Sequence, residues 1–432
     1  MVLLMKKILA ILLLSLLGQN LVLANDLAIM TFNKWLYDNG HKKYVIKDNN
    51  SYKNNLKLKL SKKKWTLPEE ANPNFDTLLY YFFKYQHSHF VPGSRTKQWD
   101  TYEAKSTSQY YKFKSELKED KYIKKQMNKT ALLSYLLYED GKITVDEISP
   151  KDRFGNFVNN ETKLRSMSVG KTMVSYVMGH AICRGYIDSV DSRLNDWSLT
   201  KNTPYENQKI IDLLNMNAGD QKYVNRGNFK DGSGDVDTIT ISNAMYKMSN
   251  LKKSKSKYNY NALLPHLLLN YISFKSGDDF ENLLEDIFQN EAQIEQSVFF
   301  FKHPNMNKES GIANSMFFAT RYDYLRIAKS MLDDWQNDTC MGKYLKIIYK
   351  NRIPKGNFDQ RFDLSNTFSG TKTYAGFFHT GYSGMKERSI MGMSGYGGQE
   401  IIIDFDRSKI LVIHSIHENF NWKKIVYSVI KN

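Results

Sequence analysis

Two strand-forming segments that lie far apart in the sequence enclose a long region of helical periodicity. The first, residues 131–148, has apolar runs on either side of a turn signal at residues 139–141, and the second, residues 394–415, repeats this pattern around residues 404–407. Apolar residues at helical spacing mark the run after residue 168, residues 207–220, 263–277 and 320–335, and a terminal run from residue 422. The chain has no internal repeat and no regular alternation of strands with helices. This order predicts an α+β fold, with one antiparallel sheet built from distant segments, flanking helices and a helical insertion region.

The first 24 residues differ in character from the rest of the chain. Two lysines precede a short apolar run, and small residues at Val22 and Ala24 end it, as in a secretory signal over residues 1–24 that is cleaved before Asn25. We therefore expect export across the inner membrane to the periplasm. No later apolar run approaches the ~20 residues of a membrane span, so we expect no transmembrane segment after signal removal.

A tyrosine- and lysine-rich extension, residues 25–125, follows the predicted signal and carries no recognisable chemical motif. Apolar residues at helical spacing predict one packed helix in it, at residues 74–90. The main domain is expected to span residues 126–432. The sequence leaves the role of the extension open.

Positive charge is in excess along the whole chain. Lys and Arg number 61 against 45 Asp and Glu, a net charge of +16, or +14 (16 − 2) after the two lysines of the signal are removed. The charges are scattered, and only residues 53–64 form a basic cluster. This pattern is typical of a solvated surface, with a weak association with an anionic envelope surface as its functional alternative. Export argues against a nucleic-acid partner.

Motifs for metals and nucleotides each lack a required residue. Residues 170–172, Gly-Lys-Thr, end like a phosphate-binding loop, but an arginine stands at the position of its first glycine. A calcium-loop-like stretch from Asp231 has Ser242 where a glutamate is required. We therefore predict no metal and no cofactor. Two cysteines, Cys183 and Cys340, are too few for a disulfide scaffold, and the sequence leaves open whether they pair.

Ser168 and Lys171 stand three residues apart at the head of an apolar helical run. Residues i and i+3 share one side of a helix, so the hydroxyl and the ammonium can be in contact, and the helix N-terminus adds a positive field. A serine hydroxyl becomes a useful nucleophile when a neighbour takes its proton or stabilises its alkoxide, and a desolvated lysine can do either. The alternative is an ordinary capped helix, because Ser-x-x-Lys is a short pattern.

The sequence around this pair resembles the serine β-lactamase and penicillin-binding protein superfamily. Within it, the chain is most similar to the class C-type β-lactamase-related branch, which includes DD-peptidases, esterases and 6-aminohexanoate-dimer hydrolases. The branch has a nucleophile helix that reads S-M-S-K-S and runs into a glycine, here Gly185, and then into an acidic-aromatic end, here Asp196–Trp197. Later motifs of the branch are similar, in the same order, to residues 210–220, 316–332 and 393–415. The resemblance covers residues 131–430 and implies a β-lactamase/transpeptidase-like fold, with Ser168 as nucleophile and Lys171 as its activating partner.

The family also places a tyrosine, in a Y-x-N or Y-x-S motif, beside the Ser–Lys pair. Alignment on the later Gly277 puts this tyrosine at Tyr260, with Ala262 where the family has Asn or Ser. Tyr258 is the alternative, with Tyr260 at its third position. The missing third-position amide bears on recognition of a substrate amide more than on acyl transfer.

A strand of the closing hairpin should line the site. The resemblance puts Met393–Ser394–Gly395 at the place of the family's K-T-G, without its lysine, and His379–Thr380–Gly381 mimics an H-x-G variant too far upstream to be preferred. Gly395 lets the strand backbone approach a substrate, and Gly398 and Gln399 belong to the same substrate-site segment. By alignment, the backbone N–H groups of Ser168 and Tyr396 form the oxyanion hole.

Together these features predict an exported serine hydrolase that cleaves an ester or amide bond through an acyl-enzyme on Ser168. Lys171 activates the serine, and Tyr260 relays the proton to the leaving group and later activates water. Without the K-T-G lysine, we expect a small-molecule ester, a linear amide or a short peptide as substrate, as for nylon-oligomer hydrolases, esterases or DD-peptidases, and no true β-lactamase activity. The alternative is a catalytically silent binding or scaffolding member of the same fold in the cell envelope. Substrate and oligomeric state stay open.

Overall fold

The computed structural model describes Leu78, Phe82 and residues 100–236, 239–303, 311–356 and 365–432. The chain divides into two compact units, Met1–Gln98 and Trp99–Asn432. The predicted signal and the basic cluster lie outside the described residues. So does most of the helix predicted at residues 74–90, of which only Leu78 and Phe82 are described, both in helical turns and both buried. All the other described residues belong to the second unit.

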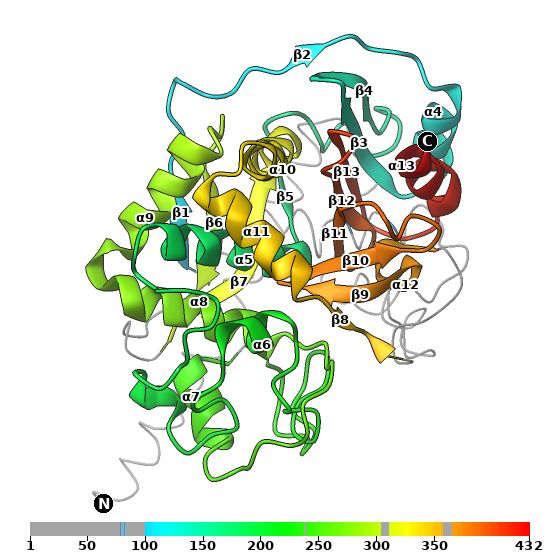
Figure 1. The fold of residues 1–432 in the computed structure, drawn as a ribbon. Helices are drawn as coiled ribbons and strands as arrows, with labels where there is room; N and C mark the ends of the chain where they lie inside the picture. Colours follow the sequence, from blue (N-terminus) through cyan, green and yellow to red (C-terminus); the bar gives the residue numbers. More distant parts are fainter. Residues whose placement is uncertain (1–77, 79–81, 83–99, 237–238, 304–310, 357–364) are drawn as a thin grey trace, which may run out of the picture. The chain divides into compact units, whose positions relative to one another are not determined.

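A nine-stranded sheet dominates the described part of this unit (Figure 1). All neighbouring strands are antiparallel except the pair β2 and β4. The predicted hairpin at residues 131–148 forms β3 and β4, and β3 pairs directly with the last strand, with Leu136 opposite Val412. The prediction of an antiparallel sheet built from distant segments is confirmed. In spatial order, its strands are β2 (Lys114–Ser115), β4 (Lys142–Ile148), β3 (Leu132–Glu139), β13 (Lys409–Ser415), β12 (Gln399–Asp404), β11 (Ile390–Gly395), β10 (Phe378–Tyr382), β9 (Thr371–Ala375) and β8 (Ile353–Pro354).

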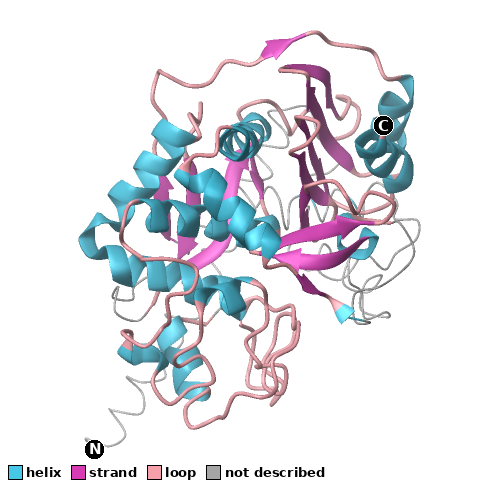
Figure 2. Ribbon diagram, in the orientation of Figure 1, coloured by secondary structure: helices cyan, strands magenta, loops and turns pink. Residues whose placement is uncertain are grey.

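A second sheet of four strands was not predicted (Figure 2). Four consecutive residues of its strand β6, Val298 to Phe301, are buried, so the strand shows no alternation between two faces. A short continuous apolar run cannot be assigned to strand or helix by periodicity. In spatial order, its strands are β1 (Asp100–Ala104), β6 (Val298–Lys302), β7 (Ala313–Thr320) and β5 (Lys163–Arg165).

Helix α5 (Val169–Cys183) lies between the two sheets (Figure 1). It packs against β7 of the small sheet and against β11 and β12 of the large one. Residues Val169 to Ala181 are all buried, as expected for a helix that is covered on every side. The helix therefore holds its N-terminal residues at a fixed place between the two sheets.

The other predicted helices also form. Residues 207–220 contain α6, residues 263–277 contain α8, and residues 320–335 form most of α10. On the large sheet, α10 packs against the same face as α5, whereas α4 and the C-terminal helical turns join a core on the opposite face. The remaining helical elements are α4 (Lys121–Lys129), η5 (Ser198–Thr200), α6 (Ile210–Leu214), α7 (Ile241–Lys247), α8 (Leu263–Ser276), η6 (Gly277–Asp279), α9 (Phe280–Asp286), η7 (Ile287–Glu291), α10 (Arg321–Gln336), α11 (Cys340–Lys350), α12 (Thr367–Gly370), η10 (Lys423–Tyr427) and α13 (Ser428–Lys431).

Residues 100–125, which the sequence analysis placed in the N-terminal extension, pack into the main unit. Strand β1 pairs along its whole length with β6, and β2 pairs with β4. Helix α4 contributes Ile123 and Met127 to the core under the large sheet. The compact unit accordingly begins at Trp99, earlier than the expected boundary at residue 126.

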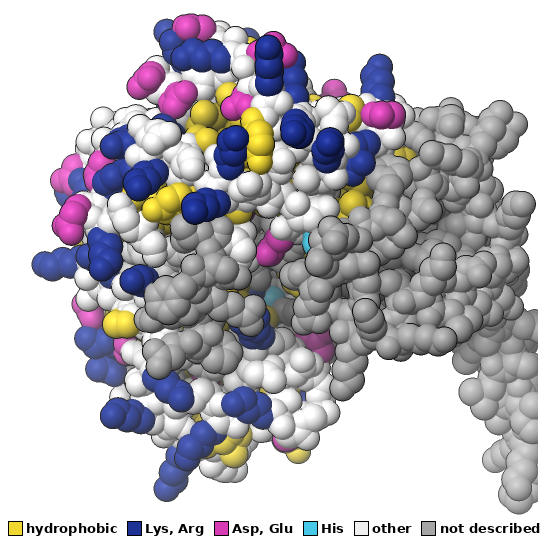
Figure 3. All heavy atoms as spheres, turned by 90° about the vertical axis from the view of Figure 1, so that its right-hand side faces the viewer, with side chains coloured by type: hydrophobic (Ala, Val, Ile, Leu, Met, Phe, Trp, Pro, Cys, Tyr) yellow, Lys and Arg dark blue, Asp and Glu magenta, His cyan; other side chains and the backbone are white. Residues whose placement is uncertain are grey.

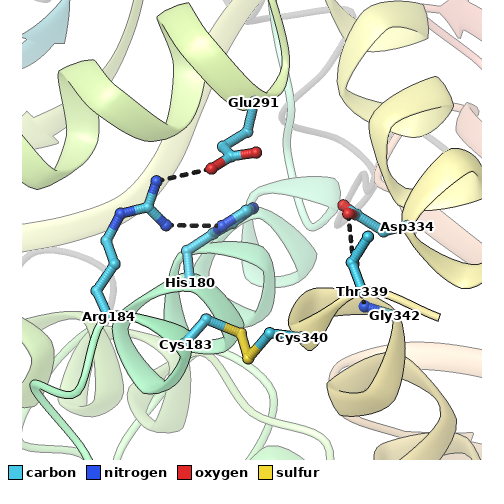
Figure 4. Close-up of a disulfide and its surroundings, with 8 residues drawn as sticks. All are labelled: His180, Cys183, Arg184, Glu291, Asp334, Thr339, Cys340 and Gly342. Atoms are coloured by element: carbon cyan, nitrogen blue, oxygen red, sulfur yellow. Dashed lines mark hydrogen bonds and ion pairs between the residues drawn. A yellow bond between two sulfur atoms is a disulfide. The ribbon is translucent and has the colours of Figure 1, made fainter. Parts of the chain in front are cut away.

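Cys183 and Cys340 form a disulfide, which the sequence left open. It joins the C-terminal end of α5 to the N-terminal end of α11 (Figure 4). Near it, Arg184 contacts the buried His180 and pairs with Glu291. Burial and the Arg184 charge lower the pKa of His180 to about 3, so this imidazole is neutral at physiological pH. The crosslink ties the far end of the Ser168 helix to a helix that packs beside it.

Charged side chains are dispersed over the face of the molecule drawn in Figure 3, with Lys and Arg interspersed among Asp, Glu and uncharged groups. This distribution agrees with the expectation of a solvated basic surface and shows no single basic patch on the described part of that face. Among the described residues, no helix combines the length and the apolar character that a membrane crossing requires.

Candidate active site

Ser168 lies on the short turn between β5 and α5. The preceding Met167 has a φ of 48°, in the left-handed region that residues with a Cβ seldom adopt. Hydrogen bonds to β7 hold the turn, since the Ser166 N–H donates to the Phe317 carbonyl at 2.8 Å and the Phe317 N–H donates to Ser166 Oγ at 3.0 Å. Strained backbone that is fixed by its surroundings is a recurring feature of functional sites.

The predicted Ser–Lys pair is formed. Lys171 Nζ donates to Ser168 Oγ at 3.1 Å, and the Lys171 side chain is buried while Ser168 is half-buried. Ser168 directly precedes α5 with a helical backbone (φ −69°, ψ −9°), and its hydroxyl makes no capping hydrogen bond. The hydroxyl is instead directed to the lysine.

Glycine at position 170 allows the first turn of α5 to press against β7. A Cβ at Gly170 would lie 2.1 Å from the backbone oxygen of Ser315, a distance at which the helix or the strand would have to move. Gly170 is therefore required by packing, and it fixes the position of Ser168 and Lys171 relative to the small sheet.

Tyr260 lies against Lys171. The Lys171 ammonium is 5.2 Å from the centroid of the Tyr260 ring, within the range of a cation–π contact. The buried Tyr260 ring also contacts Phe368, Tyr374 and His379. The structure thus brings together the three side chains that the sequence assigned to catalysis, Ser168, Lys171 and Tyr260.

The alternative tyrosine, Tyr258, contacts Tyr374, as Tyr260 does. Its ring packs on Tyr374 at 5.2 Å, and it lines a cavity of about 520 Å³. The other residues around this cavity are polar or basic for the most part, namely Asn217, Gln221, Lys230, Lys257, Asn259, Ile353, Pro354, Lys355 and Gly356. The contact with Lys171 favours Tyr260 over Tyr258 for the catalytic role.

His379, which the sequence analysis set aside, borders the site from β10. Its ring stacks on Tyr260 at a centroid distance of 6.3 Å, and its Nδ1 has no hydrogen-bond partner in the described part of the chain. Burial and the nearby charges of Lys355 and Lys171 hold the pKa of His379 well below its usual range. The imidazole is therefore a neutral part of the wall around Tyr260.

The end of β11 reaches the turn that carries Ser168. A Cβ at Gly395 would lie 2.7 Å from the backbone oxygen of Ser166, so only glycine allows this approach. The next residue, half-buried Tyr396, begins a turn in which Gly397 and Gly398 both have positive φ angles, 84° and 91°. This placement is compatible with the predicted oxyanion hole at the N–H groups of Ser168 and Tyr396, which stays a prediction.

Gly398 and Gln399 stabilise the turn at residues 396–398. The Gln399 side chain is buried, and its amide donates to the carbonyls of Ser415 at 2.5 Å and Tyr396 at 3.3 Å. A Cβ at Gly398 would lie 2.7 Å from the Phe420 ring. These two predicted site residues contact the hairpin and Phe420, which follows it, and Gln399 holds the Tyr396 carbonyl.

A buried acid, Glu400, lies on β12 opposite Ser394 of the strand that replaces K-T-G. Glu400 Oε1 accepts hydrogen bonds from Ser394 Oγ at 3.2 Å and from the Thr367 N–H at 3.3 Å. Its Oε2 is buried, with no hydrogen-bond partner among the described residues. Burial above all, helped by the charge of Glu418, raises the pKa of Glu400 to about 8. Glu400 is therefore protonated at neutral pH.

The sequence did not predict a role near the site for two buried acids, Asp220 and Glu400. It also did not predict that His379 lies beside Tyr260. Glu400 carried a weak signal, because it precedes three isoleucines in a strand whose residues are all buried. A charged residue in such a strand needs a specific reason. The described residues contain no group of three or more His, Cys, Asp or Glu side chains that could hold a metal ion.

No protein-family model and no curated protein sequence matches the chain. Several solved structures are similar to it. A protein from Bacillus anthracis assigned as a 6-aminohexanoate-dimer hydrolase has a TM-score of 0.57 at 14% identity, over 85% of this chain and 96% of that one. A protein from Bacteroides dorei assigned as a β-lactamase has a TM-score of 0.53 at 13% identity, over 72% of this chain and 96% of that one. The octameric penicillin-binding protein homologue from Pyrococcus abyssi has a TM-score of 0.51 at 14% identity, over 71% and 74%.

These similarities confirm the α+β, β-lactamase/transpeptidase-like fold that the sequence predicted. At such low identity, the chemistry at Ser168 depends on the site itself.

Proposed function

We propose that this chain is an exported serine hydrolase that cleaves an ester or amide bond through an acyl-enzyme on Ser168. One observation carries the proposal: the buried Lys171 donates a hydrogen bond to the Ser168 hydroxyl at the start of α5. The contact between Lys171 and Tyr260 supports it, because it completes the serine, lysine and tyrosine set on one side of the site.

In the acylation step, Ser168 Oγ attacks the carbonyl carbon, and its proton is relayed through the Tyr260 hydroxyl toward the leaving group. The positive charge of Lys171 and the N-terminus of α5 stabilise the negative charge that develops at Ser168 Oγ. The tetrahedral oxyanion lies at the turn formed by Ser168 and the end of β11, where backbone N–H groups stabilise it. Collapse of this intermediate breaks the bond to the leaving group, which takes the proton through Tyr260.

In the deacylation step, water attacks the ester between the acyl group and Ser168 Oγ. Tyr260 relays one proton from this water to Ser168 Oγ as the acyl C–O bond breaks, which restores the serine hydroxyl and releases the acid product. Position 393 of the strand that replaces K-T-G is a methionine, so this strand supplies no cation for a β-lactam carboxylate. A small ester or a linear amide is therefore the substrate class that we propose.

The export part of the proposal has its own support. A disulfide between Cys183 and Cys340 is compatible with an oxidising compartment such as the periplasm, where such bonds persist. Edman sequencing of the protein recovered from the periplasm should begin at Asn25. Recovery in the cytoplasmic fraction with residues 1–24 intact would contradict export.

A fluorophosphonate probe tests the hydrolase proposal. The wild-type chain should be labelled, Ser168→Ala should not, and Lys171→Ala should be labelled far more slowly. Ser175→Ala is a matched control, because Ser175 lies on the same helix and its hydroxyl is bound to Tyr344. Wild-type protein that is neither labelled nor able to hydrolyse short-chain p-nitrophenyl esters would favour a silent binding protein of the same fold.

A further inference from the structure

The loop that carries Tyr260 is fastened around a single buried carboxylate, Asp220. Asp220 follows helix α6 and is fully buried. Its Oδ1 accepts a hydrogen bond from Asn259 Nδ2 at 2.8 Å, and its Oδ2 accepts from Asn261 Nδ2 at 3.1 Å and from the Tyr205 hydroxyl at 2.9 Å. The two amides belong to the residues that precede and follow Tyr260, so the carboxylate holds both neighbours of the proposed catalytic tyrosine.

Further hydrogen bonds leave this short segment little freedom. The Asn259 N–H donates to the Met216 carbonyl at 2.8 Å, and the Ala262 N–H donates to the Arg226 carbonyl at 2.9 Å. Asn261 Oδ1 accepts from the first two N–H groups of α8, at 3.0 and 3.1 Å. With its neighbours bound on one side, Tyr260 presents its ring to Lys171 on the other.

A buried carboxylate in this place is costly to the fold. Burial raises the pKa of Asp220, and the hydrogen bonds from Asn259, Tyr205 and Asn261 act in the opposite direction. In its described residues, 215–236 and 239–261, the segment from Asn215 to Asn261 contains one short helix, α7, so its backbone has few repetitive hydrogen bonds to hold it. Side-chain bonds to a fixed acceptor are the means by which such a loop gains a single conformation.

We propose that Asp220 is a positioning residue for acyl transfer at Ser168: it fixes the Tyr260 ring against Lys171 by binding the amides on either side of that tyrosine. The proposal rests on the proposed hydrolase function. The third-position Asn or Ser of the family motif is Ala262 here, and Asn261 together with Asp220 supplies polar anchoring at this loop instead.

The test compares Asp220→Asn with Tyr205→Phe in the full chain. Asp220→Asn replaces one carboxylate oxygen by an NH₂ group, which cannot accept a hydrogen bond. In either orientation this NH₂ group faces the side-chain NH₂ of Asn259 or of Asn261, so at least one of these two hydrogen bonds is lost. Tyr205→Phe removes a bond to the same carboxylate and leaves both amide anchors in place. If Asp220→Asn does not fold, Asn259→Ala removes one anchor and retains Asp220 with its other two donors.

Two readouts separate positioning from stability. For hydrolysis of p-nitrophenyl esters, Asp220→Asn should lower kcat on the order of 100-fold, the scale expected for a displaced catalytic group, while KM changes less. Tyr205→Phe should stay within a few-fold of wild type. In a Tyr260→Phe background, Asp220→Asn should have no further effect, because Asp220 acts only through Tyr260.

The second readout needs no activity. In protein labelled with ¹³C-tyrosine, the Tyr260 ring resonance, assigned by its loss in Tyr260→Phe, should shift in Asp220→Asn and stay in place in Tyr205→Phe. An unchanged resonance in folded Asp220→Asn would overturn the proposal. If wild type proves not to be a hydrolase, this resonance still decides whether Asp220 positions Tyr260, so the two failures can be told apart.

Discussion

Replacement of Glu400 by glutamine should change how the stability of the fold depends on pH. The raised pKa means that the folded state binds the Glu400 proton more tightly than the unfolded state does. Unfolding between the ordinary pKa of 4.5 and the folded value of about 8 therefore releases a proton, and stability must fall as the pH rises through that interval.

The magnitude follows from the width of the interval. Each pH unit contributes about 1.4 kcal/mol, so the wild-type chain should lose about 5 kcal/mol from this group between pH 4.5 and 8, and about 3 kcal/mol of it by pH 7. Glu400→Gln keeps an oxygen that accepts from Ser394 and Thr367 but carries no ionisable proton. The variant should lack this component and gain on wild type as the pH rises.

Urea denaturation at pH 5, 6, 7 and 8 measures the effect, with the free energy of unfolding of each variant plotted against pH. The difference between wild type and Glu400→Gln isolates this carboxyl from other titrating groups. Glu161→Gln, at an exposed position, is the control and should run parallel to wild type. Parallel curves for wild type and Glu400→Gln would refute the account of a buried, protonated Glu400.

Other predictions follow from the crosslink, the site strand and the two tyrosines. Cys183→Ser together with Cys340→Ser removes a crosslink between residues 157 positions apart and should lower the free energy of unfolding by up to about 5 kcal/mol, measured by urea denaturation under non-reducing conditions. Gly395→Ala should destabilise the fold by about 1–3 kcal/mol and slow fluorophosphonate labelling, because the added methyl group would clash with the backbone oxygen of Ser166, two residues before the nucleophile. Labelling at the wild-type rate would contradict this close approach. Tyr260→Phe should lower kcat for ester hydrolysis by roughly 100-fold or more, while Tyr258→Phe should have a small effect, and the reverse order would exchange their roles.

The sequence was sufficient where local pattern and long-range packing agree. The apolar run after Ser168 forms a helix because almost every one of its side chains is buried, and the hairpin turn at Asp140–Gly141 has the two positive φ angles that its sequence favours. Ser168, Lys171 and Tyr260 could be placed together by resemblance to a family pattern.

What the sequence could not give depends on contacts between distant segments. Strand β6 reads as an apolar run of undefined type, and its role appears only when β1 and β7 pair on either side of it. Asp220 and Asn261 are 41 positions apart, and neither has a local pattern that marks it. The partners of a buried carboxylate are decided by the tertiary fold, so a residue such as Asp220 is found only from the structure.

The central claim, an acyl-enzyme on Ser168, is tested most directly by mass spectrometry of the protein quenched in acid during turnover of a p-nitrophenyl ester. We predict a mass increase equal to the acyl group on the peptide that contains Ser168, with greater accumulation in Tyr260→Phe, where deacylation is slowed. The adduct should be absent from Ser168→Ala. Turnover without any adduct on that peptide, or turnover that persists in Ser168→Ala, would contradict the account.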